Sequence, residues 1–212
     1  MIHFTKKDIS DLERLPRLNL INSITGYKPA NLVGTVDKKG QTNLAIISSV
    51  VHMGSDPALL GFFMRPMVTE RHTMENILES EYYTINHIHE AIAQKAHFTS
   101  ADFDRHESEF EKCMLTAIYK DEFIAPYVSE SKIQIGMHLV QKLDIRLNGT
   151  ILVVGQVTHI YMEDAAYLGN GIVDLNAVGT ICVSGLDTYH RVQKIATYPY
   201  ANPSELPDFS KD

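Results

Sequence analysis

The stretch MHLVQKLDIRLNGTILVVGQVTHIYM, Met137–Met162, indicates the fold more clearly than any other part of the sequence. Two long, largely apolar runs flank the pair Asn148-Gly149. This pair favours a type I′ turn, because both of its residues tolerate the positive φ angles that a two-residue hairpin loop requires. The stretch therefore predicts a long antiparallel β-hairpin.

Further strand signals lie on either side of this hairpin. Residues 30–37, 41–51 and 58–64 are apolar or β-branched runs separated by the turn signals DKKG and GSDP, and we expect them to form an antiparallel meander. Residues 81–88 predict another strand, and residues 177–198 predict one or two more. Six or more strands with few helices indicate a mainly β fold, a β-barrel with helical additions.

Three segments interrupt the strand pattern with helical signals. Lys6–Leu15 predicts a short amphipathic helix that stops before Pro16. Residues 69–80 predict a second helix, with Thr69 or Thr73 as its N-cap, and residues 90–115 read as a mostly helical, exposed insertion. We expect a single domain over residues 1–212, with its core in about 22–200 and with the N-terminal helix (1–20) and tail (201–212) peripheral.

Charge and composition argue against several classes of partner. A net charge of −7 does not suit a broad nucleic-acid or anionic-membrane surface. The sequence contains no apolar stretch long enough to span a membrane, and its charged N-terminus lacks a signal core, so we expect a cytoplasmic protein. Cys113 and Cys182 lie far apart and predict free thiols.

Several familiar catalytic motifs are missing from the sequence. It has no P-loop, no G-x-G-x-x-G opening a helix, no HExxH and no GxSxG, which argues against a Rossmann domain. Among ten histidines, only His87 and His89 would share a strand face, and a metal site needs three or four convergent ligands. A nucleophile at Ser48 or Ser49 would lack the elbow glycines. We therefore expect no metal site and no nucleophilic triad.

A candidate anion site surrounds the start of the second predicted helix. Arg65, Arg71 and His72 lie close in sequence to Thr73 and to N–H groups that a helix N-terminus leaves free. Arginine can bind a phosphate monoester through two parallel hydrogen bonds. A solvated helix start with surface charges is the alternative interpretation of the same residues.

Polar side chains also interrupt the apolar run before this anion site. Asn43, Ser48 and Ser49 would lie beside it, and the small Ala45 would let a flat ligand approach the backbone. Together these features favour a planar heteroaromatic ligand carrying a phosphate. Serines bonded to neighbouring backbone are the alternative.

Four stretches resemble the flavin reductase-like family of FMN-binding split-barrel proteins, which includes the flavoredoxins. Residues 26–50 carry an N-x-A-x-x-S pattern, SDPALLGFFMRP resembles a PP-L-x-F strand, RHTMENI resembles R-x-T-x-x-N-I, and SEFEKCMLTA resembles EF-x-x-x-G-L-T with Met114 at a common glycine position. The later GNGIVD resembles a GDGxxD turn. The likeness covers about residues 22–200.

The resemblance implies a split-barrel homodimer that binds FMN near the dimer interface and reduces it with NADH or NADPH. Carried over by position, the residues along the isoalloxazine and ribityl chain would be Asn43, Ala45, Ile47, Ser48 and Ser49. Those at the phosphate end would be Met64, Arg65, Arg71, His72 and Thr73. The late segment DTYHR would bring Tyr189 or His190 to the flavin. His190 is a candidate for orienting the nicotinamide or a product, and a structural role is the alternative.

The expected function is therefore an NAD(P)H-dependent flavin reductase that transfers hydride from nicotinamide C4 to flavin N5. Backbone N–H groups of Ala45–Val50 would stabilise the negative charge around N1 and the C2 carbonyl. Three alternatives remain open: a flavoredoxin-like electron carrier, a split-barrel reductase of another small molecule, and a ligand-binding barrel without redox activity. Flavin and nicotinamide are the expected partners, with no nucleic acid and no membrane.

Overall fold

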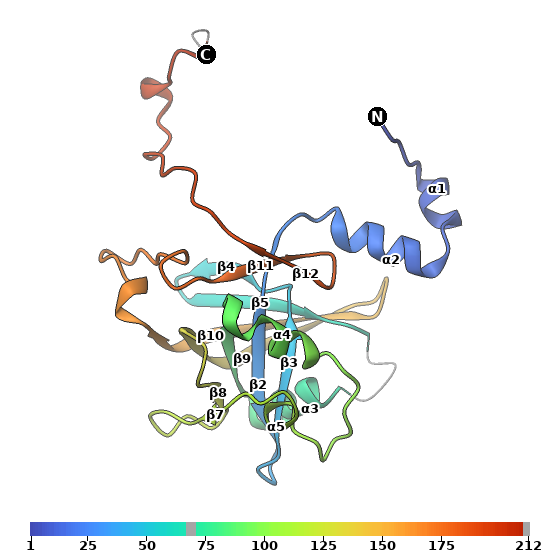
Figure 1. The fold of residues 1–212 in the computed structure, drawn as a ribbon, viewed down its shortest axis with the longest axis vertical. Coiled ribbons are helices and arrows are strands. Elements are labelled where there is room, and N and C mark those ends of the chain that lie inside the picture. Colours follow the sequence, from blue (N-terminus) through green and yellow to red (C-terminus); the bar gives the residue numbers. More distant parts are fainter. Residues whose placement is uncertain (67–70, 210–212) are drawn as a thin grey trace.

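The computed structural model describes residues 1–66 and 71–209, and its centre is a seven-stranded antiparallel sheet (Figure 1). The strand order is β3-β2-β6-β9-β10-β5-β4. These strands are β2 (Asn31–Val36), β3 (Thr42–Ile47), β4 (Val51–Ser55), β5 (Ala58–Met64), β6 (Tyr82–His87), β9 (Ile133–Ile145) and β10 (Thr150–Met162). The mainly β fold with helical additions is confirmed. The edge strands β3 and β4, both fully described, do not pair with each other, so the sheet is not closed.

Smaller elements surround this sheet. The remaining strands are β1 (Lys28–Pro29), β7 (Ala117–Ile118), β8 (Tyr127–Val128), β11 (Ile181–Ser184) and β12 (Thr188–Arg191). The helices are α1 (Lys6–Asp11), α2 (Arg14–Ser23), α3 (His72–Ser80), α4 (Ala93–Phe98) and α5 (Glu109–Lys112), and short 3₁₀ turns occupy Glu90–Ile92, Asp164–Ala166 and Pro203–Glu205. Strands β1, β11 and β12 form a separate three-stranded sheet, and β7 pairs with β8.

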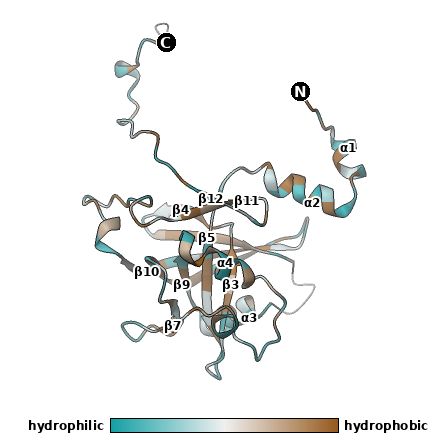
Figure 2. Ribbon diagram, in the orientation of Figure 1, coloured by the Kyte–Doolittle hydropathy of each residue, from teal (hydrophilic) through white to brown (hydrophobic). Residues whose placement is uncertain are grey.

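The two largest apolar clusters of the described residues hold these layers together. The first fills the inside of the curled sheet, where Val33, Phe62 and Tyr83 pack against Met74 and Ile77 of α3. The second lies between the outer face of the sheet and the segments that cover it, and comprises Ala30, Leu32, Leu44, Ile88, Ile92, Ala96, Phe110, Cys113, Leu115, Val128, Ile181 and Val183. Burial of apolar surface at roughly 25 cal/mol per Å² makes these cores the main stabilising term. In Figure 2, brown segments mark the apolar residues along the strands of the sheet.

The long hairpin is present, but its turn is not the one expected. Strands β9 and β10 pair from Ile145 with Thr150, which leaves four residues in the loop rather than two. Gly149 has a positive φ of 74°, whereas Asn148 does not. The Asn148 side chain instead accepts a hydrogen bond from the Thr150 backbone N–H at 3.1 Å. The type I′ prediction is therefore wrong, because the asparagine closes the loop through its side chain.

The expected meander is also wrong. Strands β2 and β3 pair, and β4 and β5 pair, but the two pairs lie at opposite edges of the sheet. The run of residues 41–51 is not one strand, because β3 ends at Ile47 and the chain crosses the open side of the sheet before β4 begins at Val51.

The predicted helices differ from the observed ones at three points. Pro16 does not end a helix but is the third residue of α2, within the first turn, where its missing N–H has no helical acceptor. Residues 90–115 are helical only in part. Thr69 lies outside the described residues, and Thr73 is not a cap, because Arg71 holds the N-cap position of α3.

The two ends of the chain leave the body of the molecule (Figure 1). Helices α1 and α2 contain no buried residue, and the segment after β12 is exposed throughout its described length. Cys113 and Cys182 are free thiols, as expected. Within residues 1–66 and 71–209, no helix combines the length and the apolar character needed to cross a membrane.

Candidate functional site

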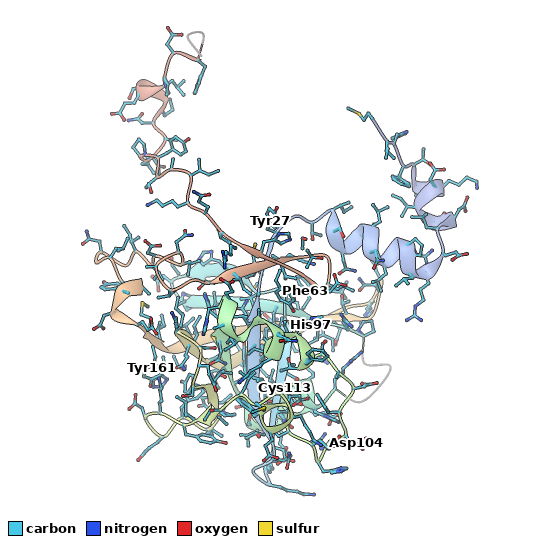
Figure 3. The ribbon with its side chains drawn as sticks, in the orientation of Figure 1. Tyr27, Phe63, His97, Asp104, Cys113 and Tyr161 are labelled. Carbon is cyan, nitrogen blue, oxygen red and sulfur yellow. The ribbon has the colours of Figure 1, made fainter. Side chains whose placement is uncertain are left out.

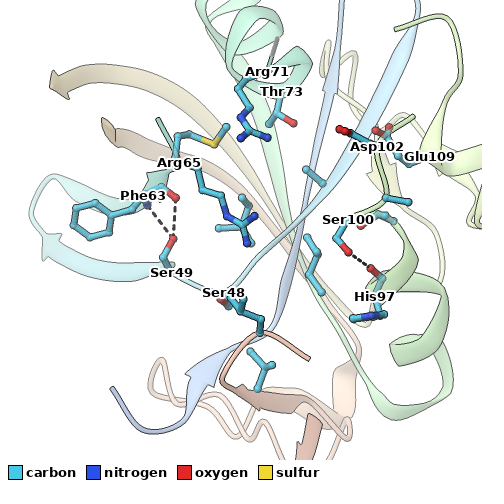
Figure 4. Close-up of a pocket in the computed structure, with 18 of the residues that line it drawn as sticks. Ser48, Ser49, Phe63, Arg65, Arg71, Thr73, His97, Ser100, Asp102 and Glu109 are labelled. Atoms are coloured by element: carbon cyan, nitrogen blue, oxygen red, sulfur yellow. Dashed lines mark hydrogen bonds between the residues drawn. The ribbon is translucent and has the colours of Figure 1, made fainter. Parts of the chain in front are cut away.

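A cavity of about 630 Å³ opens where the sheet is split, between β3 with the chain that follows it, the end of β5, the start of α3, the α4–α5 segment and β12 (Figure 4). Its wall includes all but His190 of the residues that the sequence assigned to a cofactor. These are Asn43, Ala45, Ile47, Ser48, Ser49, Met64, Arg65, Arg71, His72, Thr73 and Tyr189. Fold geometry thus gathers residues that are up to 146 positions apart, from Asn43 to Tyr189.

Side chains fasten the outer edge of β3, which forms one wall of the cavity. One edge of β3 pairs with β2, and the other edge has no strand neighbour among the described residues. On that free edge the Leu44 N–H donates to Glu109 Oε2 at 2.8 Å. The buried Asn43 Nδ2 donates to Thr73 Oγ1 at 2.8 Å, which ties the strand to α3. These bonds satisfy polar groups that would otherwise be buried without partners.

The Ser49 hydroxyl bridges the split between the end of β3 and strand β5. Its Oγ accepts a hydrogen bond from the Phe63 N–H at 3.0 Å and donates to the Phe63 carbonyl at 3.1 Å (Figure 4). One side chain therefore does what a neighbouring strand would do. Ser49 thus follows the alternative interpretation, a serine bonded to backbone. The Ser48 side chain forms no hydrogen bond within the described residues and lines the cavity.

Positive charge gathers at the α3 end of the cavity. In Figure 4 the side chains of Arg65 and Arg71 both project into the open space. The Arg71 Nε atom is buried and has no hydrogen-bond partner within the described residues. Arg71 is also the N-cap of the nine-residue helix α3, and within residues 1–66 and 71–209 no side-chain hydrogen bond caps the start of this helix. Free helix N–H groups and guanidinium groups together suit an anion.

Carboxylates face this positive end, and the sequence interpretation missed them. Asp102 and Glu109 lie side by side across the cavity from Arg71 (Figure 4). Glu109 is only 7% exposed, and burial raises the pKa of its carboxyl, an effect that the Leu44 N–H and the nearby His72 only partly offset. The charged stretch around it had indicated an exposed insertion. The one available signal was the EF pair of the fourth family-like stretch.

Two aromatic rings complete the wall on the β12 side. His97 of α4 (Figure 3) and Tyr189 of β12 line the cavity, and His97 Nδ1 lies 3.0 Å from the Tyr189 hydroxyl. His97 was not among the predicted site residues, because an isolated histidine in a helix carries no local signal.

The structure does not place His190 on the cavity wall. Successive side chains of a strand point to opposite faces, so His190 points away from the face that carries Tyr189. Its Nε2 hydrogen-bonds to Ser184 Oγ at 2.8 Å, and its ring packs edge-on against Tyr27 with centroids 4.8 Å apart. The structure therefore does not bring His190 to this cavity, and its suggested contact with flavin or nicotinamide stays a prediction.

The site as a whole suits a flat ligand with an anionic tail. The volume lies within the usual range of about 300–1,000 Å³ for small-molecule sites. Ala45 and Ile47 give an apolar strand surface, and the arginines lie at one end. Within the described residues, no group of three or more histidine, cysteine, aspartate or glutamate side chains is arranged to hold a metal ion.

Comparison with known proteins agrees with this geometry. Residues 27–173 match the family model described as flavin reductase like domain. A protein from Shewanella frigidimarina NCIMB 400, described as having a split barrel domain and provisionally assigned as a flavin reductase, is 45% identical and superposes with a TM-score of 0.92, covering 95% of this chain and 100% of that one. The predicted split-barrel fold is thereby confirmed.

Two more distant structures share the fold. Nitrilotriacetate monooxygenase component B from Bacillus cereus is 19% identical, with a TM-score of 0.83 and coverage of 93% of this chain and 98% of that chain. Flavoredoxin of Desulfovibrio vulgaris (Miyazaki F) is 20% identical, with a TM-score of 0.72 and coverage of 82% and 92%, respectively. At these identities the likeness concerns the fold.

Proposed function

Because the chain belongs to the flavin reductase-like family, we propose that this flavin-related oxidoreductase binds FMN and takes hydride from NADH or NADPH. One observation carries the proposal. The buried Arg71 Nε, which lacks a partner within the described residues, lies at the same cavity as the flat surface of β3. A guanidinium with a buried donor that lacks a partner suits the phosphate of FMN, and the strand surface suits the FMN ring system.

Each wall of the cavity has a separate task in this proposal. Arg65 and Arg71 hold the phosphate, and Ala45 and Ile47 face the ring. When bound, FMN supplies the atom that accepts hydride. The N–H groups of Ser48 and Ser49 donate no hydrogen bond within the described residues, so they are free to stabilise negative charge on a ligand oxygen or nitrogen. This chemistry requires no side-chain acid or base, which agrees with the absence of a catalytic dyad motif.

The proposal also includes the oligomeric state and the location of the protein. The terminal arms carry exposed apolar side chains, among them Leu15 (66% exposed), Ile24 (67%) and Tyr198 (82%). Such surface favours cover by another protein surface, and we propose a homodimer in the cytoplasm. Gel filtration with light scattering checks the dimer.

A visible absorption spectrum tests the proposed function. The purified chain is incubated with FMN, desalted, and then mixed anaerobically with NADH or NADPH. A retained flavin spectrum that bleaches with one nucleotide supports the reductase and identifies its reductant. Retained flavin that neither nucleotide bleaches favours an electron carrier or a different reductant. NAD(P)H turnover with free FMN, without retention, identifies flavin as a substrate. If the protein neither retains flavin nor turns over NAD(P)H with free FMN, the proposal is contradicted.

A further inference from the structure

We propose that His97 and Tyr189 form a subsite for the second ligand of the cavity, where they bind the conjugated carbonyl oxygen of a flat molecule. Two ligands share this chemistry, the carboxamide of a nicotinamide and a conjugated carbonyl compound that accepts electrons. The inference rests on the proposed function, because it needs flavin on the opposite, β3 wall.

The pair is well placed for this role. Both residues line the cavity, but they come from α4 and β12 rather than from the strand and helix that surround the anion end. Their side chains hydrogen-bond at 3.0 Å, and their rings meet edge to face at 89° with centroids 5.8 Å apart. Each ring therefore restrains the other, so that any donor they present is already oriented.

In either tautomer of His97, one donor of the pair is left without a hydrogen-bond partner within the described residues. If the Tyr189 hydroxyl donates to His97 Nδ1, the proton of the neutral imidazole is on Nε2, which forms no hydrogen bond within the described residues. If His97 Nδ1–H donates instead, the Tyr189 hydroxyl keeps its own proton. Burial and the nearby Asp187 raise the pKa of Tyr189 to about 12, so the phenol stays protonated at neutral pH.

The remaining surroundings favour an oxygen acceptor on a ring. Val183 and Leu186 supply apolar surface beside the pair, which suits a flat hydrocarbon face. A neutral donor suits a neutral carbonyl oxygen, whereas the cavity already has arginines for a phosphate. The subsite and the anion site are thus chemically different parts of one cavity.

Three small probes test the subsite by binding alone. Protein saturated with FMN is titrated with benzamide, benzaldehyde or toluene, and the change in the flavin absorption spectrum measures the binding of each probe. The variants are Tyr189→Phe, His97→Leu and the double variant, with the exposed tail variant Tyr198→Phe as matched control. Benzamide represents the nicotinamide carboxamide and benzaldehyde represents a carbonyl acceptor. Toluene has no oxygen.

Loss of one neutral hydrogen bond predicts a threefold to tenfold weaker binding of at least one oxygen probe in the double variant, at about 1 kcal/mol per bond. Each single variant keeps one donor and loses less, and toluene binding and Tyr198→Phe stay at the wild-type value. A loss confined to benzamide assigns the subsite to nicotinamide, and a loss with benzaldehyde assigns it to the electron acceptor.

Unchanged affinity for both oxygen probes in the double variant overturns the inference. An equal loss of affinity for toluene also overturns the inference, because the two side chains would then contribute packing rather than a hydrogen bond. If the wild-type chain fails to bind FMN, the proposed function fails and the inference fails with it. Retained flavin with unchanged probe binding removes the subsite alone.

Discussion

The two sides of the curled sheet are held together by different kinds of bond. On one side, β9 and β10 pair along 13 residues each, and backbone hydrogen bonds do the work. On the other side the sheet is split, and the side chains of Ser49 and Glu109 bond to backbone groups that no strand reaches. The cavity lies along the split. A binding site is thus found where the backbone ladder ends and polar side chains replace it.

This comparison predicts that substitutions on the paired side mainly lower the stability of the fold, whereas substitutions at the split mainly change ligand binding. The paired side depends on close packing between strands and side chains. The split side depends on single hydrogen bonds, each with a net contribution of about 1 kcal/mol. Substitutions on the two sides can therefore break or sharpen the comparison.

The largest effect is expected at Gly155 on β10. A Cβ atom there would lie 2.1 Å from the hydroxyl of Tyr83, whose ring is fully buried. We expect Gly155→Ala to lower the free energy of unfolding by about 3 kcal/mol, the upper part of the range for overpacked cores. Urea unfolding measures the loss. Tyr83→Phe in the same chain should restore most of it. Gly54→Ala should change little, because a Cβ there would make only an ordinary contact with the Pro57 carbonyl oxygen at 3.5 Å.

His87 gives the paired side a dependence on pH. Burial lowers the pKa of this imidazole from 6.5 to about 4. Below pH 6.5 the unfolded chain takes up a proton that the folded chain does not, so stability falls as the pH falls towards 4, by about 3 kcal/mol in all.

Urea unfolding between pH 7 and 4 compares wild type with His87→Gln, and His52→Gln on exposed β4 is the control. The wild type should lose about 3 kcal/mol relative to His87→Gln, and His52→Gln should follow the wild type. Parallel curves for all three proteins would show that His87 protonates freely in the folded state.

At the split, Arg71 should have the strongest effect on binding. If Arg71 binds the FMN phosphate as proposed, Arg71→Ala should lower the affinity for FMN by tenfold to a hundredfold, the equivalent of about 1.5–3 kcal/mol for a charged hydrogen bond. The affinity for riboflavin, which lacks the phosphate, should fall much less. Fluorescence titration with both ligands measures the difference, and the turn variant Arg146→Ala serves as control. Equal losses for both ligands would remove Arg71 from the phosphate end.

Glu109 tests the edge of β3. Glu109→Ala leaves the buried Leu44 N–H without an acceptor, which should lower the free energy of unfolding by about 1–3 kcal/mol. It should also lower the affinity for FMN, because the strand would be displaced. Glu109→Gln keeps an acceptor oxygen and should restore most of both. Urea unfolding and FMN titration measure the two effects. Glu111→Ala, exposed on the same helix, is the control. No difference between Ala and Gln would mean that the bond to Leu44 does not hold the strand.

Local patterns in the sequence predicted the elements, but not how the split is made. Strand β5, helix α3 and the β9–β10 hairpin follow from periodicity and composition over a few residues. The crossing between Ile47 and Val51 does not, because which edge β4 joins depends on strands that come later in the chain. The meander was the choice with the shortest connections, and long-range pairing overrode it.

The candidate site shows the same division. The residues near Asn43 and Arg71 could be found because a polar break in an apolar run has few local explanations. Glu109 and His97 could not be found in this way. Glu109 lies in a charged stretch whose pattern indicates exposure, and its burial is partly offset by the Leu44 N–H and by the nearby His72, which lie far away in the sequence. His97 acquires a partner 92 positions away.

The smallest effect is expected for Ser49, whose hydroxyl forms both bonds across the split. Ser49→Ala removes the acceptor of the Phe63 N–H and the donor to its carbonyl, at a site open to water that can replace them. We expect a loss of about 1 kcal/mol or less in global stability. Hydrogen exchange should be more sensitive, because the Phe63 amide would exchange by local opening of the split. Faster exchange confined to this edge of β5, with Ser55→Ala as an unchanged control, would show that a single hydroxyl closes the split. Unchanged exchange at Phe63 would show that the edge is held by packing instead.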